Sequence, residues 1–281
     1  MWNKFKLILR MIKIEHTVFA LPFAFMGAFL AAHGWPSKRQ VFWILVAMVG
    51  IRSAAMAFNR LVDAEIDAAN QRTRNREIPR GTLKKKEVWL FVLLASAVFI
   101  TAAHELNRIC FILSPVALAV TFLYSFTKRF TWLSHLFLGG AIGLAPVGGW
   151  LAVSGSFHPI AFILGAAVLF WIAGFDIVYA CQDYEFDRSF VLKSIPQRWG
   201  IGMALRISEL CHLIAFGLLA AVGVMARLGP AYYLGLLLIL AFLVAQHLIV
   251  SPEDLSRVNL SFFTMNGVIS VVIFVATLFS L

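Results

Sequence analysis

The sequence predicts an all-α, polytopic membrane protein of nine transmembrane helices around a central cavity, and two observations carry this prediction. First, 61% of the residues are hydrophobic and 14% are charged, whereas a soluble domain is about half apolar and about a quarter charged. Second, apolar runs of about 18 to 21 residues, enough for a helix to cross roughly 30 Å of hydrocarbon, recur along the whole chain. Because no Pro/Gly/Ser-rich linker divides the chain, we expect one membrane domain over residues 1–281.

The expected helices follow one another with short connections and two longer loops. They lie near residues 17–34, 41–58, 88–104, 109–126, 134–153, 159–179, 207–226, 230–249 and 262–281. The connections on one side carry 19 Lys and Arg residues, and those on the other side carry four. Since cytoplasmic loops retain positive charge, the N-terminus is expected in the cytoplasm. The two long loops, residues 59–87 and 180–206, then face the cytoplasm too.

The formal net charge of +10 would suggest a nucleic-acid partner if the chain were soluble. The basic residues sit mostly between apolar runs, so we expect no nucleic acid but contact with the lipid bilayer. Arg60 and Arg74 are expected to contact lipid head groups or to act as positive charges that keep their loop in the cytoplasm, and not to bind a ligand. Cys110, Cys181 and Cys211 form no C-x-x-C pair, which argues against a disulfide framework or a zinc site. Nothing in the sequence indicates an obligate protein partner.

Half of the acidic residues gather at the cytoplasmic ends of the second and sixth expected helices, where seven of the 14 Asp and Glu lie. If the second helix continues into its loop, one polar stripe about 80° wide holds four residues. They are Arg52, Asn59, Asp63 and Asp67. A second stripe of similar width lies at the end of the sixth helix and holds Asp176, Tyr179, Asp183 and Asp187. The two stripes can face one cavity.

Opposed carboxylate pairs at i and i+4 suit a magnesium-dependent diphosphate site. Magnesium prefers carboxylate oxygens and shares its coordination sphere with phosphate and water. The basic segment from Arg72 to Arg80, together with Lys128 and Arg129, can balance the charge of a diphosphate. The alternative is an ordinary solvated loop face. We call Asp63 and Asp67 the first acidic window and Asp183 and Asp187 the second. Because both windows are expected at equal depth on the same side of the membrane, a diphosphate site is favoured over a solvated loop face.

These residues resemble the signatures of the UbiA-type intramembrane aromatic prenyltransferase family. The first signature is similar to N-x-x-x-D-x-x-x-D followed by R-[ST]-x-x-R, which is matched by Asn59, Asp63, Asp67, Arg72, Thr73 and Arg76. The second places an Asp and a Tyr ahead of D-x-x-x-D, as do Asp176, Tyr179, Asp183 and Asp187. The resemblance covers essentially the whole chain. One departure is Asn70, where many members carry an aliphatic residue.

The resemblance implies roles for these residues. Mg²⁺ and a polyprenyl diphosphate are expected at the catalytic residues Asp63, Asp67, Asp183 and Asp187, with Asn59 as a further metal ligand. Arg72, Arg76 and Lys128 are expected to bind the diphosphate. Tyr124 and Tyr179 are expected to shield an allylic cation or to pack at the interface. His16 contacts the aromatic acid or anchors the interface, and Asp176 belongs to the site without an assigned role.

Arg52 stands inside the second expected helix, two turns before Asn59. An arginine at membrane depth needs an anion or a wet cavity. Its guanidinium either binds the carboxylate of the aromatic acid or forms a structural ion pair, for which Asp176 is a candidate. We expect the first role, in which Arg52 binds the aromatic acid.

The expected function is Mg²⁺-dependent transfer of a polyprenyl group to the ring of a 4-hydroxybenzoate-like acid in ubiquinone biosynthesis, at a site in the cytoplasmic membrane that opens to the cytoplasm. The alternative acceptor is 1,4-dihydroxy-6-naphthoate in menaquinone biosynthesis, because the chain is also similar to the menaquinone prenyltransferase of the futalosine pathway. A different class, an ion or solute transporter, would also use intramembrane Asp and Arg. A transporter would show broken helices at the midplane, whereas these acidic stripes lie at one interface.

Overall fold

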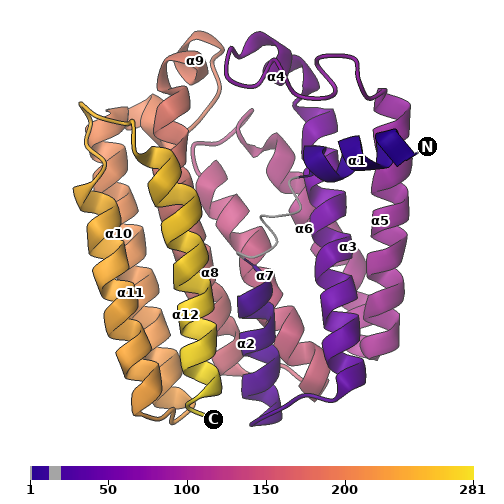
Figure 1. The fold of residues 1–281 in the computed structure, drawn as a ribbon, viewed down its shortest axis with the longest axis vertical. Helices are drawn as coiled ribbons and strands as arrows, with labels where there is room; N and C mark the ends of the chain where they lie inside the picture. Colours follow the sequence, from indigo (N-terminus) through magenta and orange to yellow (C-terminus); the bar gives the residue numbers. More distant parts are fainter. Residues whose placement is uncertain (1, 13–19) are drawn as a thin grey trace.

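The computed structural model describes residues 2–12 and 20–281, and the long helices of the described part form a bundle in which they run roughly parallel or antiparallel to one another, with α1 lying across them (Figure 1). The helices are α1 (Trp2–Met11), α2 (Leu21–Ala32), α3 (Lys38–Val62), α4 (Ala64–Ala69), α5 (Lys85–Leu106), α6 (Arg108–Thr127), α7 (Ser134–Ser154), α8 (Pro159–Ala180), α9 (Tyr184–Ser189), α10 (Ile195–Met225), α11 (Pro230–Leu248) and α12 (Asn266–Leu278). A 3₁₀ turn, η2 (Cys181–Asp183), joins α8 to α9, and a π-helix, η3 (Leu260–Met265), leads into α12.

The prediction of an all-α, polytopic membrane protein is confirmed. Within residues 2–12 and 20–281, seven helices are long and apolar enough to cross a membrane, and two further apolar helices are shorter. The shorter ones are α2 and α12, which stand where the first and last spans were expected. Both are shorter than predicted. The chain turns at the left-handed residue His33 after α2, and helix α12 is extended at its start by the π-turns of η3.

The start of α10 was predicted wrongly, because the helix begins at Ile195 and not near residue 207. Ser194 caps it by accepting a hydrogen bond from the Gln197 backbone N–H, and a proline follows in the first turn. Both are strong signals for a helix start. The helix then kinks at Gly200, whose φ of 79° is easily adopted only by glycine.

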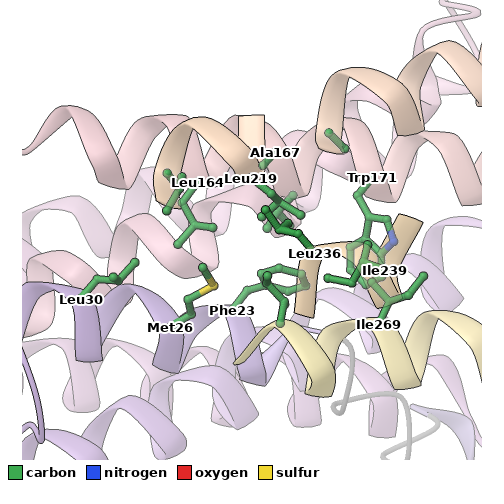
Figure 2. Packing of buried hydrophobic residues seen from close by; sticks show 14 of the residues in the cluster. Phe23, Met26, Leu30, Leu164, Ala167, Trp171, Leu219, Leu236, Ile239 and Ile269 are labelled. Carbon is green, nitrogen blue, oxygen red and sulfur yellow. The ribbon is translucent and has the colours of Figure 1, made fainter. Parts of the chain in front are cut away.

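The core that joins the C-terminal helices to α2 is built from large apolar side chains. Figure 2 shows Phe23 and Met26 of α2 in one cluster with residues of α8, α10, α11 and α12. Trp171 of α8 packs its ring 5.1 Å from that of Phe23, measured between centroids. This packing holds α8 in place, and with it the second acidic window that follows α8.

Helices α2 and α7 approach so closely that glycine is required between them. A Cβ atom added at Gly149 would collide with the carbonyl oxygen of Ala24, and one added at Gly27 would collide with that of Pro146. At Gly148, by contrast, a Cβ atom would meet nothing within 4 Å. Small residues at such crossings let helix backbones pack in a membrane.

We therefore expect Gly149→Ala to destabilise the protein by about 1–3 kcal/mol through overpacking. The matched substitution Gly148→Ala, one residue away on the same helix, should leave stability nearly unchanged. Thermal unfolding in detergent, followed by the loss of monodisperse protein, measures both. Equal melting temperatures for the two variants would show that α2 and α7 do not pack this closely.

Candidate active site

The first acidic window is placed by a near-continuous helix. Asp63 ends α3 and precedes α4, and its backbone N–H still bonds to the Asn59 carbonyl at 2.9 Å. Asp67 follows one turn later in α4, where its own N–H bonds to the Asp63 carbonyl at 2.7 Å. The expected continuation of the helix into its loop is thus largely found. It places both carboxylates on the same side of the chain.

The second window has the same construction. Asp183 lies in the 3₁₀ turn η2 at the end of α8, and Asp187 lies one turn later in α9. Figure 1 shows α4 and α9 at the same end of the bundle, on opposite sides of its axis. The exposed fractions of Asp67, Asp183 and Asp187 are only 5%, 8% and 1%. Three buried carboxylates at one end of a membrane bundle need charged or metal partners.

Both windows line one cavity of about 470 Å³. Every predicted site residue that the structure describes lines it, namely Arg52, Asn59, Asp63, Asp67, Arg72, Arg76, Tyr124, Lys128, Asp176, Tyr179, Asp183 and Asp187. His16 lies outside the described residues. The cavity continues from the acidic end into an apolar part lined by residues such as Ile44, Met48, Phe99, Leu106 and Leu151.

Each carboxylate of the two windows is paired with a different cation. Asp63 pairs with Arg129 at 3.1 Å, and Asp67 with Arg76 at 2.5 Å. Asp187 lies 3.8 Å from Lys128. Asp183 is held by Arg72, whose Nε donates to its Oδ1 at 3.0 Å and whose Nη2 contacts its Oδ2.

The electrostatics keep these partners charged. Burial acts to lower the pKa of Arg72, but the hydrogen bond and charge of Asp183 outweigh it and raise that pKa. The pKa of Lys128 is raised in the same way, with Asp187 as the main opposing charge. Burial raises the pKa of Asp63, although Arg129 acts in the opposite direction. A metal ion that bound these carboxylates would therefore have to displace a proton or the Lys or Arg side chain that is paired with the Asp.

The four carboxylates fit magnesium by their chemistry. One oxygen each of Asp67 and Asp187, Oδ2 in both cases, is buried without a hydrogen-bond partner. In the described ranges, no group of three or more His, Cys, Asp or Glu side chains is arranged to hold a metal alone. Mg²⁺ takes one or two carboxylates and completes its shell with phosphate and water.

Two further hydrogen bonds connect the loop after the first window to the second half of the chain. Asn70, the departure from the family pattern, donates from Nδ2 to Asp183 Oδ1 at 3.1 Å and so links the first loop to the second window. Tyr179 accepts a hydrogen bond from Arg72 Nη1 at 2.8 Å, and the guanidinium lies over its ring. The sequence alone showed neither contact.

Asp176 does not pair with Arg52, so it is not the partner in a structural ion pair of that arginine. Asp176 Oδ2 lies 2.6 Å from Nδ1 of His135, a side chain with no exposed surface. The other ring nitrogen of His135 accepts the Ile195 N–H at 3.4 Å, so Nδ1 carries the proton and donates to Asp176. Arg52 donates from Nη1 to the Ile12 carbonyl at 3.3 Å, at the end of α1.

Arg60 was expected at the lipid head groups, and that expectation is wrong. The side chain is 7% exposed and lines the cavity between the residues of the first window. Helical arithmetic could have found it, because Arg60 falls about 20° from Asp67 on a continuous helix. Arg74, in contrast, is exposed as expected.

A multi-pass helical bundle with a carboxylate- and arginine-lined mouth over an apolar cavity has room for an anionic head group at the mouth and for an apolar chain below it. A model described as the UbiA prenyltransferase family matches residues 20–268. The chain belongs to the UbiA prenyltransferase family, so it is a membrane-bound prenyltransferase.

The chain is similar in sequence to 4-hydroxybenzoate octaprenyltransferases of several bacteria. The 4-hydroxybenzoate octaprenyltransferase of Aromatoleum aromaticum is 30% identical over 247 residues, which are 88% of this chain and 83% of the relative. The enzyme of the same name from Vibrio cholerae is 33% identical over 222 residues, 78% of each chain.

Two solved structures share the fold. The apo structure of a UbiA homolog from Aeropyrum pernix K1 superposes with a TM-score of 0.86 at 34% identity, over 94% of this chain and 97% of that one. A UbiA homolog from Archaeoglobus fulgidus, bound to GPP and Mg²⁺, gives a TM-score of 0.73 over 96% and 99% of the chains. At 23% identity the second likeness shows the fold alone.

Proposed function

We propose that this chain transfers a polyprenyl group from a prenyl diphosphate to the ring of a 4-hydroxybenzoate-like acid in quinone biosynthesis, with Mg²⁺ at the two acidic windows. The observation that carries the proposal is the single cavity that both windows line, with an apolar part beyond them. The names of the relatives support the acceptor. The GPP and Mg²⁺ of the Archaeoglobus fulgidus homolog support the donor and the metal.

The depth of the cavity suits a long prenyl chain. Along α3 the lining runs from Asp63 to Ile44, which is roughly 28 Å at 1.5 Å per residue. The walls at the Ile44 end are apolar, and they include Leu106 and Leu151. The diphosphate of the donor would bind at the acidic end, and its isoprene units would lie along the apolar walls.

The chain's residues would divide the chemistry. Asp63, Asp67, Asp183 and Asp187, with Asn59 beside Asp63, would hold the metal; Arg72, Arg76 and Lys128 would donate hydrogen bonds to the diphosphate oxygens. Bound Mg²⁺ supplies a Lewis acid that stabilises the charge of the leaving diphosphate.

The bond changes are those of an aromatic substitution. The C–O bond of the prenyl diphosphate breaks and its electron pair leaves with the diphosphate. A ring carbon of the acid forms the new C–C bond, and the ring then loses its proton. Tyr124 and Tyr179, which line the cavity, would shield the allylic cation with their rings, and the apolar walls would exclude water from it. Asp176, held by His135, offers a proton acceptor deeper in the cavity.

Product analysis tests the proposal. Purified protein is incubated with Mg²⁺, prenyl diphosphates of several lengths and either 4-hydroxybenzoate or 1,4-dihydroxy-6-naphthoate, and the products are identified by mass spectrometry. We expect a ring-alkylated 4-hydroxybenzoate and one equivalent of diphosphate. Turnover with the naphthoate alone would move the assignment to menaquinone biosynthesis, and diphosphate release without any alkylated acid would contradict the proposal.

We further propose that the chain has nine membrane spans, α2 and α12 included, that the N-terminus is cytoplasmic and that the site opens to the cytoplasm. The charge bias of the connections supports this topology. Cysteines introduced at the exposed positions Thr82 and Ser189 should react with an impermeant label only from the cytoplasmic side. A cysteine at Ser156, also exposed, should react only from outside. Labelling of Thr82 and Ser189 from outside would reverse the topology.

A further inference from the structure

Within residues 2–12 and 20–281, Arg60 is a buried cation with no ion-pair partner. Its Nε atom is buried without a hydrogen-bond partner, and the side chain is 7% exposed. The four carboxylates of the site are already engaged by Arg129, Arg76, Arg72 and Lys128. Among the described residues, none forms an ion pair with Arg60. A buried guanidinium without a compensating anion lowers stability, so its retention here calls for an anionic ligand.

The position of Arg60 indicates which anion it meets. It lines the same cavity as the acidic windows, in the last turn of α3. The charges that act on it are those of Arg76, Asp67, Glu77 and Asp63, all at the polar end of the site. Arg52, the candidate for the acceptor's carboxylate, lies eight residues earlier on α3, about 12 Å deeper. Arg60 thus faces the place of the diphosphate and not that of the aromatic acid.

We propose that Arg60 is a diphosphate-binding residue whose guanidinium remains unpaired until the donor is bound. The inference rests on the proposed function, because it assigns the anion at the polar end to a diphosphate. In the ligand-free protein Arg76 stays with Asp67 while Arg60 has no carboxylate partner. The oxygens of a bound diphosphate would accept hydrogen bonds from the buried guanidinium of Arg60. Binding of the donor would therefore also give this buried positive charge an anionic partner.

Inorganic pyrophosphate with Mg²⁺ is the probe, and its dissociation constant is measured for wild type, Arg60→Met and Arg74→Met. Arg74→Met removes the same charge from an exposed position of the neighbouring loop and controls for net charge. We expect Arg60→Met to weaken pyrophosphate binding by about tenfold or more, as for loss of a hydrogen bond to a charged group. A loss no larger than that of Arg74→Met overturns the inference.

Ligand-free stability gives an independent readout. Because Arg60→Met removes an uncompensated buried charge and keeps the apolar stem, the ligand-free melting temperature should be unchanged or higher than in wild type, whereas its rise on adding pyrophosphate should shrink. A role as an internal ion pair predicts the reverse, a lower ligand-free melting temperature with the rise intact, and would overturn the inference. If Arg60→Met does not yield folded protein, Arg60→Gln takes its place in the binding measurement. Failure of wild type to bind pyrophosphate with Mg²⁺ would instead contradict the proposed function itself.

Discussion

Asp67→Asn and Asp187→Asn should each reduce prenyl transfer by roughly two orders of magnitude or more, the scale of losing one preorganised electrostatic contact. Each substitution removes a carboxylate charge at constant size, and each residue lines the cavity and has a buried oxygen without a hydrogen-bond partner among the described residues. Removal of Mg²⁺ with EDTA should abolish turnover in wild type. Steady-state rates with a saturating prenyl diphosphate measure all three effects.

Two exposed glutamates provide matched controls in the same short helices. Glu65 of α4 has a side chain that is 94% exposed, and Glu185 of α9 is exposed as well. Glu65→Gln and Glu185→Gln remove one negative charge each and should keep near-normal rates. If the two Asp variants retained normal turnover, or if wild type remained active in EDTA after metal removal, the metal site at the acidic windows would be wrong.

Arg52→Ala should raise the KM for the aromatic acid by about 10- to 100-fold, since a hydrogen bond to a charged group contributes roughly 1.5–3 kcal/mol. The KM for the prenyl diphosphate should stay nearly constant, because Arg52 lies about 16 Å below Asp63 along α3. Asp176, the candidate structural partner named from the sequence, contacts His135 instead. Initial rates with each substrate varied in turn separate the two effects.

Two substitutions control the Arg52 experiment. Arg52→Lys should recover only part of the affinity, because a point charge replaces a planar fork. Arg39→Ala, at the exposed start of the same helix and paired with Glu105, should change neither KM. Weaker binding of the prenyl diphosphate alone, or a large fall in the melting temperature of Arg52→Ala, would assign Arg52 to the diphosphate or to the fold.

The polar mouth of the site could be predicted from the sequence because its geometry is mostly local. Asp63 and Asp67, like Asp183 and Asp187, lie one helical turn apart, so spacing alone places each pair on one side of its segment. Between the two windows the chain passes through four long helices, α5 to α8, and this even number returns it to the same end of the bundle. These two facts depend on periodicity and topology and not on side-chain packing.

The contacts between helices could not be predicted, because they depend on how the helices pack. His135 and Asp176 are 41 residues apart on α7 and α8, and no motif joins them. The link from Asn70 to Asp183 crosses from one half of the chain to the other. The burial of Arg60 was missed because loops rich in arginine usually face head groups, although helical periodicity places this residue close to Asp67.

The most direct test of the central claim, that the two acidic windows form one magnesium-dependent diphosphate site, is a titration of pyrophosphate binding against Mg²⁺. Wild type, Asp67→Asn from the first window and Asp187→Asn from the second are compared. The account predicts binding in wild type only when Mg²⁺ is present, and a marked loss of that binding in both variants. Pyrophosphate binding that is equally tight without Mg²⁺, or that is lost in one variant and unchanged in the other, would contradict it.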